Sequence, residues 1–181
     1  MKYLQELTGI KEPLISDPYL SGGGYHEIKN GGVLKVHADF NRHPSLELDR
    51  RVNLLLYLNK SWKEEWGGNL ELYSPNNLQE PVVKITPEFN RCVIFNTTSY
   101  TYHGHPEVIS CPEDISRKSI ALYYFSTGRP KSEVSEKHST MWKEVKGETF
   151  QPDPLTFGKI IKKLTPPIIL DFMKGIHKKL K

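Results

Sequence analysis

The sequence lacks the long apolar run of a transmembrane helix, and its 181 residues include only two cysteines, Cys92 and Cys111. No stretch approaches the roughly 20 apolar residues that span a bilayer. The opening MKYLQELTGIKEP has no apolar signal-peptide core, so secretion is not indicated. Two cysteines are too few for a disulfide framework, and free thiols are typical of a reducing compartment. We therefore expect an intracellular, cytoplasmic protein.

Excess positive charge is absent from most of the chain. The net charge is +4, but the last 24 residues, from Gly158 onward, contain seven Lys and one Asp, a net of +6. The first 157 residues therefore carry −2, and no nucleic-acid-binding surface is expected there. With 37% hydrophobic and 25% charged residues, the composition indicates an ordinary globular chain with one core.

Strand-like segments dominate the first 128 residues. MKYLQELTG predicts a short helix closed by Gly9, and the segment 22–32, with five glycines, predicts turns. Runs rich in aliphatic and aromatic residues then alternate with turn signals, and they predict strands at 33–40, 50–58, 69–73, 81–86, 91–97 and 118–126. Many short strands predict an all-β barrel or sandwich, with a jelly roll among the options.

The C-terminal part has a different pattern. Residues 138–145, 154–164 and 166–181 predict helices, so we expect a barrel over 1–130 and a helical extension over 131–181. The last helix is basic and amphipathic, with one apolar stripe of Ile168, Ile169, Phe172, Met173 and Ile176. The favoured interpretation is that this stripe packs on the barrel. Contact with a membrane surface or a partner is the weaker alternative.

Two neighbouring strands carry polar groups on one face. Side chains alternate along a strand, so His37 and Asp39 project together, although such a pair alone fits a surface hydrogen bond equally well. In the next strand one face is wholly aliphatic and is expected to pack. The opposite face presents a guanidinium, an amide and a phenol, from Arg51, Asn53 and Tyr57.

A second group of polar residues lies further along, in HGH at 103–105 and in Arg117-x-Ser119. One carboxylate and two imidazoles on neighbouring strands match a 2-His-1-carboxylate facial triad, which leaves open positions on Fe(II). Arg117 can form a bidentate pair with a carboxylate, and the hydroxyl of Ser119 lies on the same face.

Together these motifs resemble a known family. H-x-D, YLN-x-x-W…GG-x-L-x-L, P-x-x-NR-x-V-x-F, a distal His and R-x-S look like the Fe(II)- and 2-oxoglutarate-dependent oxygenases, with prolyl 4-hydroxylase-like catalytic domains the nearest group. The likeness covers about residues 22–130. It implies a mainly β fold, the double-stranded β-helix or jelly-roll barrel, with short flanking helices. It also implies Fe(II) as cofactor and 2-oxoglutarate as cosubstrate, and it leaves a role for ascorbate open.

The resemblance assigns roles residue by residue. His37, Asp39 and His103 look like the iron ligands, with His105 as the alternative to His103. Arg117 is expected to bind the distal carboxylate of 2-oxoglutarate with help from Ser119 and Tyr57, and Asn53 to line the pocket. The remaining assignments are weaker: His26 and Arg51 as further contacts, His43 and His138 as loop or surface histidines, and Cys92 as a core thiol.

The implied reaction is hydroxylation of a C–H bond with release of succinate and CO2. A carboxylate at Asp39 favours hydroxylation, since related halogenases have a small residue there. An inactive metal-binding jelly-roll module is the main alternative, and a zinc hydrolase would leave Arg117-x-Ser119 unexplained. The substrate stays open: a prolyl residue in a peptide, free proline, another small metabolite, a glycan or lipid intermediate, or another protein side chain.

The sequence departs from the family pattern in its N-terminal part. Only 36 residues precede His37, fewer than the catalytic domains of this family usually have. We therefore expect either a minimal form or a chain without its front part. In both cases some apolar barrel surface needs a cover, from a homodimer or from the C-terminal helices.

Overall fold

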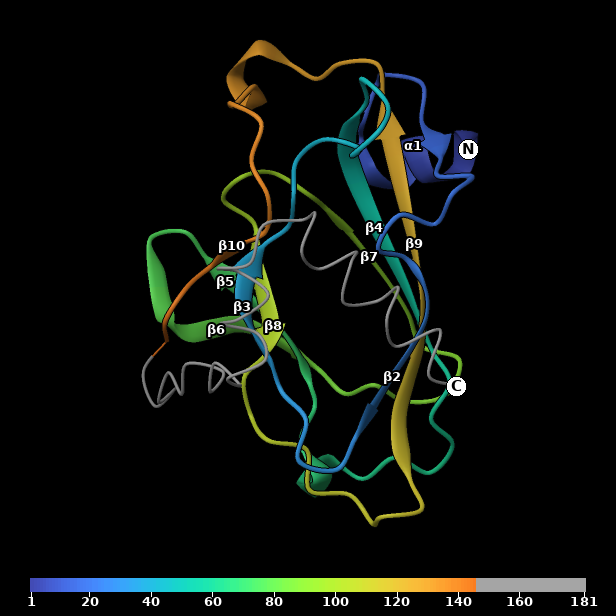
Figure 1. Cartoon of the computed structure of the whole chain (residues 1–181), viewed down its shortest axis with the longest axis vertical. Coiled ribbons are helices and arrows are strands. Elements are labelled where there is room, and N and C mark those ends of the chain that lie inside the picture. The colour runs from blue at the N-terminus through green and yellow to red at the C-terminus, as the bar shows by residue number, and fades with distance from the viewer. Residues whose placement is uncertain (146–181) are drawn as a thin grey trace, which may run out of the picture. The chain divides into compact units, whose positions relative to one another are not determined.

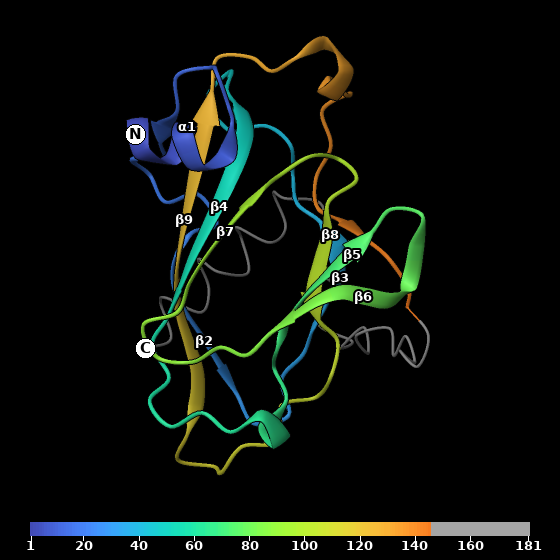
Figure 2. The same cartoon turned by 180° about the vertical axis from the view of Figure 1, so that it is seen from behind.

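Two antiparallel sheets form the part of the chain that the computed structural model describes, residues 1–145 (Figures 1 and 2). The first sheet has the order β1-β9-β4-β7, and β2 also pairs with β9. Its strands are β1 (Ile15–Ser16), β2 (Gly24–Lys29), β4 (Asp49–Tyr57), β7 (Cys92–Asn96) and β9 (Ser116–Ser126). The long strands β4 and β9 run side by side and form its centre (Figure 1).

The second sheet has the order β10-β3-β8-β5-β6. Its strands are β3 (Leu34–Ala38), β5 (Leu70–Ser74), β6 (Asn77–Ile85), β8 (Tyr102–His105) and β10 (Met141–Trp142). Contacts join the inner faces of the two sheets: Asn53 on β4 donates to the Asp39 carboxylate, and Phe95 on β7 lies edge-on to His103. This arrangement confirms the predicted mainly β, jelly-roll fold.

The helix predicted at the start of the chain is present as α1 (Lys2–Thr8). It ends at Gly9, which is left-handed with φ 71°, a conformation that glycine adopts without a steric penalty. Two short 3-10 turns, η1 (Glu64–Trp66) and η2 (Lys131–Glu133), complete the elements of this region. Over residues 1–145 no helix is both long and apolar enough to cross a membrane.

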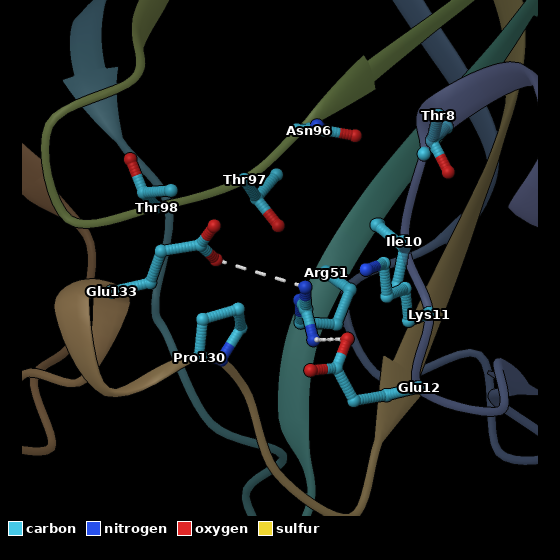
Figure 3. A pocket seen from close by; sticks show the side chains of 11 residues that line it. Thr8, Ile10, Lys11, Glu12, Arg51, Asn96, Thr97, Thr98, Pro130 and Glu133 are labelled. Atoms are coloured by element: carbon cyan, nitrogen blue, oxygen red, sulfur yellow. Dashed lines mark hydrogen bonds and ion pairs between the residues drawn. The ribbon is translucent and has the colours of Figure 1, made fainter.

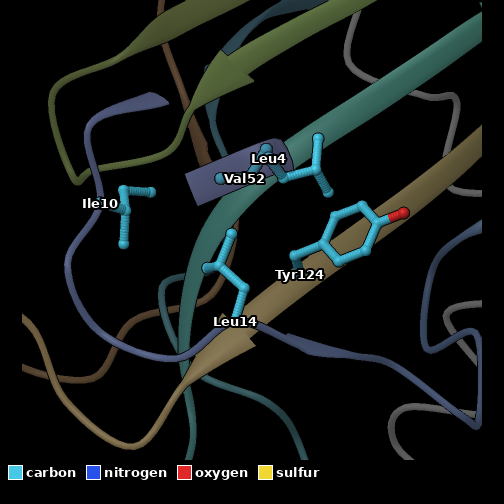
Figure 4. Close-up of a cluster of buried hydrophobic side chains, with 5 residues drawn as sticks. All are labelled: Leu4, Ile10, Leu14, Val52 and Tyr124. Atoms are coloured by element: carbon cyan, nitrogen blue, oxygen red, sulfur yellow. The ribbon is translucent and has the colours of Figure 1, made fainter. Parts of the chain in front are cut away.

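The N-terminal segment packs on the outer face of the first sheet. A hydrophobic cluster joins this segment to β4 and β9 and consists of Leu4, Ile10, Leu14, Val52 and Tyr124 (Figure 4). Val52 belongs to the aliphatic face of β4 and is fully buried, which confirms that this face is packed. With this face buried outside, Asn53 of β4 projects inwards and reaches Asp39.

Three local predictions were wrong. The glycine-rich segment contains strand β2, whose residues pair in register with β9 from Gly24↔Ala121 to Lys29↔Ser116. The helix predicted over 138–145 does not form, because Met141 and Trp142 pair with β3 as strand β10. The helices predicted over 154–164 and 166–181 lie outside the described residues. Cys92 was expected in the core but is exposed, whereas Cys111 is buried.

Candidate functional site

Two imidazoles and one carboxylate meet between the two sheets. His37 on β3 is the register partner of His103 on β8, and Asp39 follows directly after β3. These residues offer ligand atoms that all lie within 4.8 Å of one another. They form the only such group of three or more His, Cys, Asp or Glu side chains within residues 1–145. The structure therefore brings together the three residues predicted as iron ligands.

The two imidazoles are prepared to act as metal ligands. His37 Nδ1 lies 2.7 Å from the carbonyl oxygen of Lys35, so Nδ1–H donates there and Nε2 keeps its lone pair. This Nε2 lies 3.6 Å from Asp39 Oδ1, and His103 Nε2 lies 3.4 Å from Asp39 Oδ2. Burial lowers the pKa of His103 to about 4, so its imidazole is neutral at pH 7.

The Asp39 carboxylate is held by a cation and an amide. Arg50 Nη2 lies 3.0 Å from Asp39 Oδ2, and Asn53 Nδ2 donates to the same oxygen at 2.8 Å. Burial opposes ionisation of Asp39 most strongly, but the positive charge of Arg50 favours the ionised form, and the pKa of Asp39 is lowered. The Arg50 guanidinium lies between the rings of Phe40 and Tyr123, 4.3 and 3.6 Å from their centroids.

Arg50 was missed by the sequence analysis, which placed Arg51 on this face. The pairing of β4 with β9 shifts register between Arg50 and Val52, and this bulge interrupts the alternation. The side-chain oxygen of Asn53 accepts two hydrogen bonds from Arg50, and its side-chain nitrogen donates to Asp39. Both polar atoms of the Asn53 side chain are therefore used in holding Asp39 and Arg50. The expectation that Arg51 contacts the cosubstrate or substrate is corrected, because its charge is satisfied elsewhere.

Arg51 lines a separate polar pocket of about 290 Å³, between the end of α1 and the turn at Pro130 (Figure 3). Its guanidinium lies 2.9 Å from Glu12 Oε2 and 3.7 Å from Glu133 Oε2. It also donates to Ser126 Oγ and to the carbonyl of Gly128. The arginine of this pocket is thus paired within the protein.

A second cation, Arg117, is buried without an acidic partner. Its Nε donates to the carbonyl of Gly68 at 2.7 Å, and Nη2 lies 3.2 Å from the Tyr57 hydroxyl. Arg117 is 5% exposed, and none of the ion pairs formed within residues 1–145 includes it. A buried guanidinium without a counter-ion is an anion-binding group, and its planar fork suits a carboxylate. The neighbouring Tyr57 hydroxyl, whose pKa is raised by burial, is a neutral donor at the same place.

The other predicted cosubstrate residues lie in the same row of the first sheet. Ser119 on β9 pairs in register with Tyr57 on β4 and with His26 on β2. Ser119 is 3% exposed, and His26 is half-buried. Arg117, Tyr57, Ser119 and His26 therefore share one inner face.

His105 was the alternative to His103 as an iron ligand. It is buried beside Leu34, whose backbone N–H donates to its Nδ1 at 3.2 Å. It does not belong to the group of ligand atoms around Asp39. The geometry therefore favours His103. His43, expected in a loop or at the surface, lies in a loop but is buried, with Nε2 3.3 Å from Asp17 Oδ1.

Aromatic side chains surround the exposed edge of the three-residue group. Trp142 on β10 lies with its ring centroid 4.9 Å from that of His37, and it is 56% exposed. The segment before β10 is tied down by Asn41, which donates to Ser135 Oγ and to the carbonyl of Glu136. A hollow of about 310 Å³ reaches His103 and is lined by aromatic side chains that include Phe95, Tyr100 and Tyr102.

This donor set fits a first-row divalent ion with open coordination positions. Two imidazoles and one carboxylate supply three ligands, which is the composition of the facial triad of non-haem Fe(II) oxygenases. A closed structural zinc site would require a fourth ligand, and no fourth His, Cys, Asp or Glu joins the group in the described part of the chain. The separate cation, Arg117, can bind an organic anion.

Comparisons with known proteins agree with this chemistry. The chain is 34% identical over 79 residues to mouse prolyl 3-hydroxylase OGFOD1, a match that covers 42% of this chain and 14% of that protein. It is 30% identical to a prolyl 4-hydroxylase structure from Phytophthora capsici, with a TM-score of 0.42 over 56% of this chain and 31% of that one. A Trichoplax adhaerens prolyl hydroxylase, in complex with a peptide of hypoxia inducible factor, is 28% identical, with a TM-score of 0.44 over 56% of this chain and 42% of that one.

The chain thus spans less than half the length of each of these relatives. The family model of the 2OG-Fe(II) oxygenase superfamily matches residues 23–125, which is more than half of the chain. This range contains all three residues of the metal-binding group together with Arg117 and Tyr57. The protein therefore belongs to the 2OG-Fe(II) oxygenase superfamily, whose cofactors are Fe(II) and 2-oxoglutarate.

Proposed function

We propose that this protein is an Fe(II)- and 2-oxoglutarate-dependent dioxygenase that hydroxylates a prolyl residue in a peptide, with release of succinate and CO2. One observation carries the proposal: a buried group of two imidazoles and a carboxylate lies in the same interior as a buried arginine without an acidic partner. A metal site and an organic-anion site side by side are what this reaction requires.

The chain's own residues prepare both sites. Iron(II) held by His37, Asp39 and His103 would supply the oxidising chemistry, with 2-oxoglutarate as cosubstrate. His37 is fixed in orientation by the carbonyl of Lys35, and Asp39 is fixed by Arg50 and Asn53. These contacts hold the ligand atoms in place before metal arrives, which reduces the reorganisation that binding requires.

Cosubstrate selection is assigned to the residues around Arg117. Its guanidinium pairs with the distal carboxylate of 2-oxoglutarate, and the hydroxyl of Tyr57 donates to the same group. Both side chains are buried, and electrostatic attraction is stronger in such surroundings than in water. A 2-oxo acid without a second carboxylate would leave Arg117 unpaired, so it should bind poorly.

The aromatic surroundings support a proline-containing substrate. Proline-rich segments bind surfaces lined by aromatic side chains, because the flat rings pack against the pyrrolidine ring. Trp142 offers one such surface beside His37, and the hollow at His103 offers Phe95 and Tyr100. The prolyl hydroxylases among the similar proteins point to the same substrate class.

The first experiment is anaerobic addition of Fe(II) and 2-oxoglutarate, with the metal-to-ligand charge-transfer band in the visible spectrum as readout. Wild type should show the band, whereas Asp39→Ala and Arg117→Ala should lose it. Arg91→Ala is the matched control, because Arg91 is only half-buried and pairs with Glu88. Metal binding by folded wild type without a band would reject the oxygenase proposal and favour an inactive metal-binding module.

The second experiment tests the substrate. Succinate release would be measured with a set of proline-containing peptides and with the same peptides carrying Ala in place of Pro. The proposal expects release above the uncoupled background only with prolyl peptides, together with a 16 Da gain on the peptide. Equal stimulation by both sets would contradict prolyl specificity, although the oxygenase assignment would stand.

A further inference from the structure

His105 is a buried histidine that the metal group does not use. It lies on β8 two residues after His103, so both imidazoles project from the same face of the strand. Its strand partner on β3 is Leu34, and it is 1% exposed. A polar side chain buried so completely normally has partners for both of its ring nitrogens.

Among residues 1–145, only one of the two ring nitrogens of His105 has a partner. Nδ1 accepts a hydrogen bond from the backbone N–H of Leu34 at 3.2 Å. An imidazole nitrogen that accepts carries no proton, so the hydrogen of the neutral ring is on Nε2. This Nε2–H is buried, and it has no acceptor among residues 1–145. A buried donor without an acceptor points to a missing hydrogen-bonding group.

Arg117 contacts the segment that leads into β5, the strand that pairs with β8. Its Nε donates to the carbonyl of Gly68, two residues before β5 begins at Leu70, and Glu71 of β5 is the register partner of Gly104, the residue before His105. Arg117 is itself buried, and no acidic side chain within residues 1–145 pairs with it. A buried imidazole donor without an acceptor and a buried guanidinium without a counter-ion can both be satisfied by one anion.

We propose that His105 Nε2–H donates a hydrogen bond to the distal carboxylate of 2-oxoglutarate, as the third donor of a clamp with Arg117 and Tyr57. This inference rests on the proposed function and names a specificity-determining residue for it. The imidazole acts as a neutral donor, and its orientation is fixed by the N–H of Leu34. The clamp then has a charged donor, a phenol and an imidazole directed at one carboxylate.

The test is equilibrium binding of two 2-oxo acids to protein loaded with Zn(II), which avoids turnover. 2-Oxoglutarate has the distal carboxylate, and 2-oxopentanoate has the same carbon chain without it. His105→Leu removes the donor, and His105→Gln retains an N–H near the position of Nε2. By calorimetry, His105→Leu should weaken 2-oxoglutarate about tenfold, the usual effect of a lost hydrogen bond to a charged group, and leave 2-oxopentanoate unchanged.

Rescue by the conservative variant separates binding from structure. His105→Gln should restore 2-oxoglutarate binding to within about threefold of wild type if an N–H donor is what matters. Equal weakening of both acids by His105→Leu would show a structural role and overturn the proposal, as would unchanged 2-oxoglutarate binding. Failure of wild type to bind 2-oxoglutarate at all would instead overturn the proposed function.

A measurement on wild type remains informative if the variants do not fold. In the zinc-loaded protein, the Nε2–H proton of His105 should shift downfield and exchange more slowly in NMR spectra when 2-oxoglutarate is added. The same resonance should not respond to 2-oxopentanoate. An unchanged resonance with 2-oxoglutarate bound would show that His105 does not contact the cosubstrate.

Discussion

The Arg50 guanidinium lies 3.0 Å from the Asp39 carboxylate, whereas the adjacent Arg51 extends into a different pocket and pairs with Glu12. Arg50 and Asn53 both contact Oδ2 of Asp39. These two contacts set the orientation of the Asp39 carboxylate, which is also close to His37 and His103. A bulge in β4 thus gives two neighbouring arginines different surroundings.

We predict that Arg50→Gln weakens metal binding by about 10- to 100-fold, the usual effect of removing a group that orients a metal ligand. The variant loses the charge that keeps Asp39 ionised and the contact that fixes its position. The measurement is competition between the protein and a chelator for Zn(II) or Fe(II). Arg51→Gln is the matched control and should lower stability without weakening metal binding. Equal metal affinity in the two variants would contradict the role of Arg50.

Gly68 offers a test of the Arg117 site. Its φ is 70°, and an added Cβ would lie 3.1 Å from the Cδ of Arg117 and 3.1 Å from Ile109. We therefore predict that Gly68→Ala displaces the guanidinium and weakens 2-oxoglutarate binding by about tenfold, the effect of a lost charge-assisted hydrogen bond. Calorimetric titration of metal-loaded protein measures this.

Gly9→Ala is the control for this prediction. Gly9 has nearly the same φ, 71°, but nothing lies within 4 Å of an added Cβ. Both variants should lose about 1–2 kcal/mol of unfolding free energy through backbone strain. Only Gly68→Ala should lose cosubstrate affinity. If both variants bind 2-oxoglutarate as wild type does, the close packing of Gly68 against Arg117 is not functionally important.

The sequence predicted those features of the fold that depend on local pattern. The α1 helix was predicted correctly because Gly9 closes it. The central strand β4 was predicted correctly because one of its faces is aliphatic. Strand β2 was missed because Gly24 and its neighbours read as turns, although pairing with β9 holds them extended. The prediction of a helix around Trp142 was wrong, because this segment pairs with the edge of β3 and forms a strand.

The site was predictable where the motif is local and unpredictable where the backbone is irregular. Asp39 lies two residues after His37, directly after the end of β3, and the alternation of an extended chain places the two side chains together. Arg50 could not be predicted, because a bulge changes which residue faces inward, and a bulge leaves no clear pattern in the sequence. The position of Trp142 over His37 depends on pairing between residues more than one hundred positions apart.

Trp142 should report metal binding by fluorescence. Its ring centroid lies 4.9 Å from that of His37, whereas Trp62 and Trp66 pack against each other, with centroids 5.4 Å apart. We predict that Fe(II) quenches tryptophan emission and that Trp142→Phe removes most of this quenching. Trp66→Phe is the control and should lower the total emission but retain the metal-dependent change. Undiminished quenching in Trp142→Phe would show that β10 does not cover the metal site in solution.

The pH dependence of stability should reveal the buried histidines in the metal-free protein. Burial lowers the pKa of His103 to about 4 and that of His105 to about 3, below the ordinary value of 6.5. Between these values the unfolded chain binds more protons than the folded one, so stability is lost as pH falls below 6.5. Each histidine contributes at most about 1.4 kcal/mol per pH unit to the slope of the unfolding free energy.

His105→Gln separates the two contributions, because it removes one titrating group and leaves His103 in place. Urea unfolding of chelator-treated protein between pH 6.5 and 4.5 should give a slope for this variant that is smaller than that of wild type by about one proton, or about 1.4 kcal/mol per pH unit. The depressed pKa of Asp39 acts in the same direction but only below its ordinary value of 3.8, outside this range. Identical slopes for the variant and wild type would mean that His105 is already accessible to protons in the folded protein, and its imidazole would then not be the buried donor required for the carboxylate clamp.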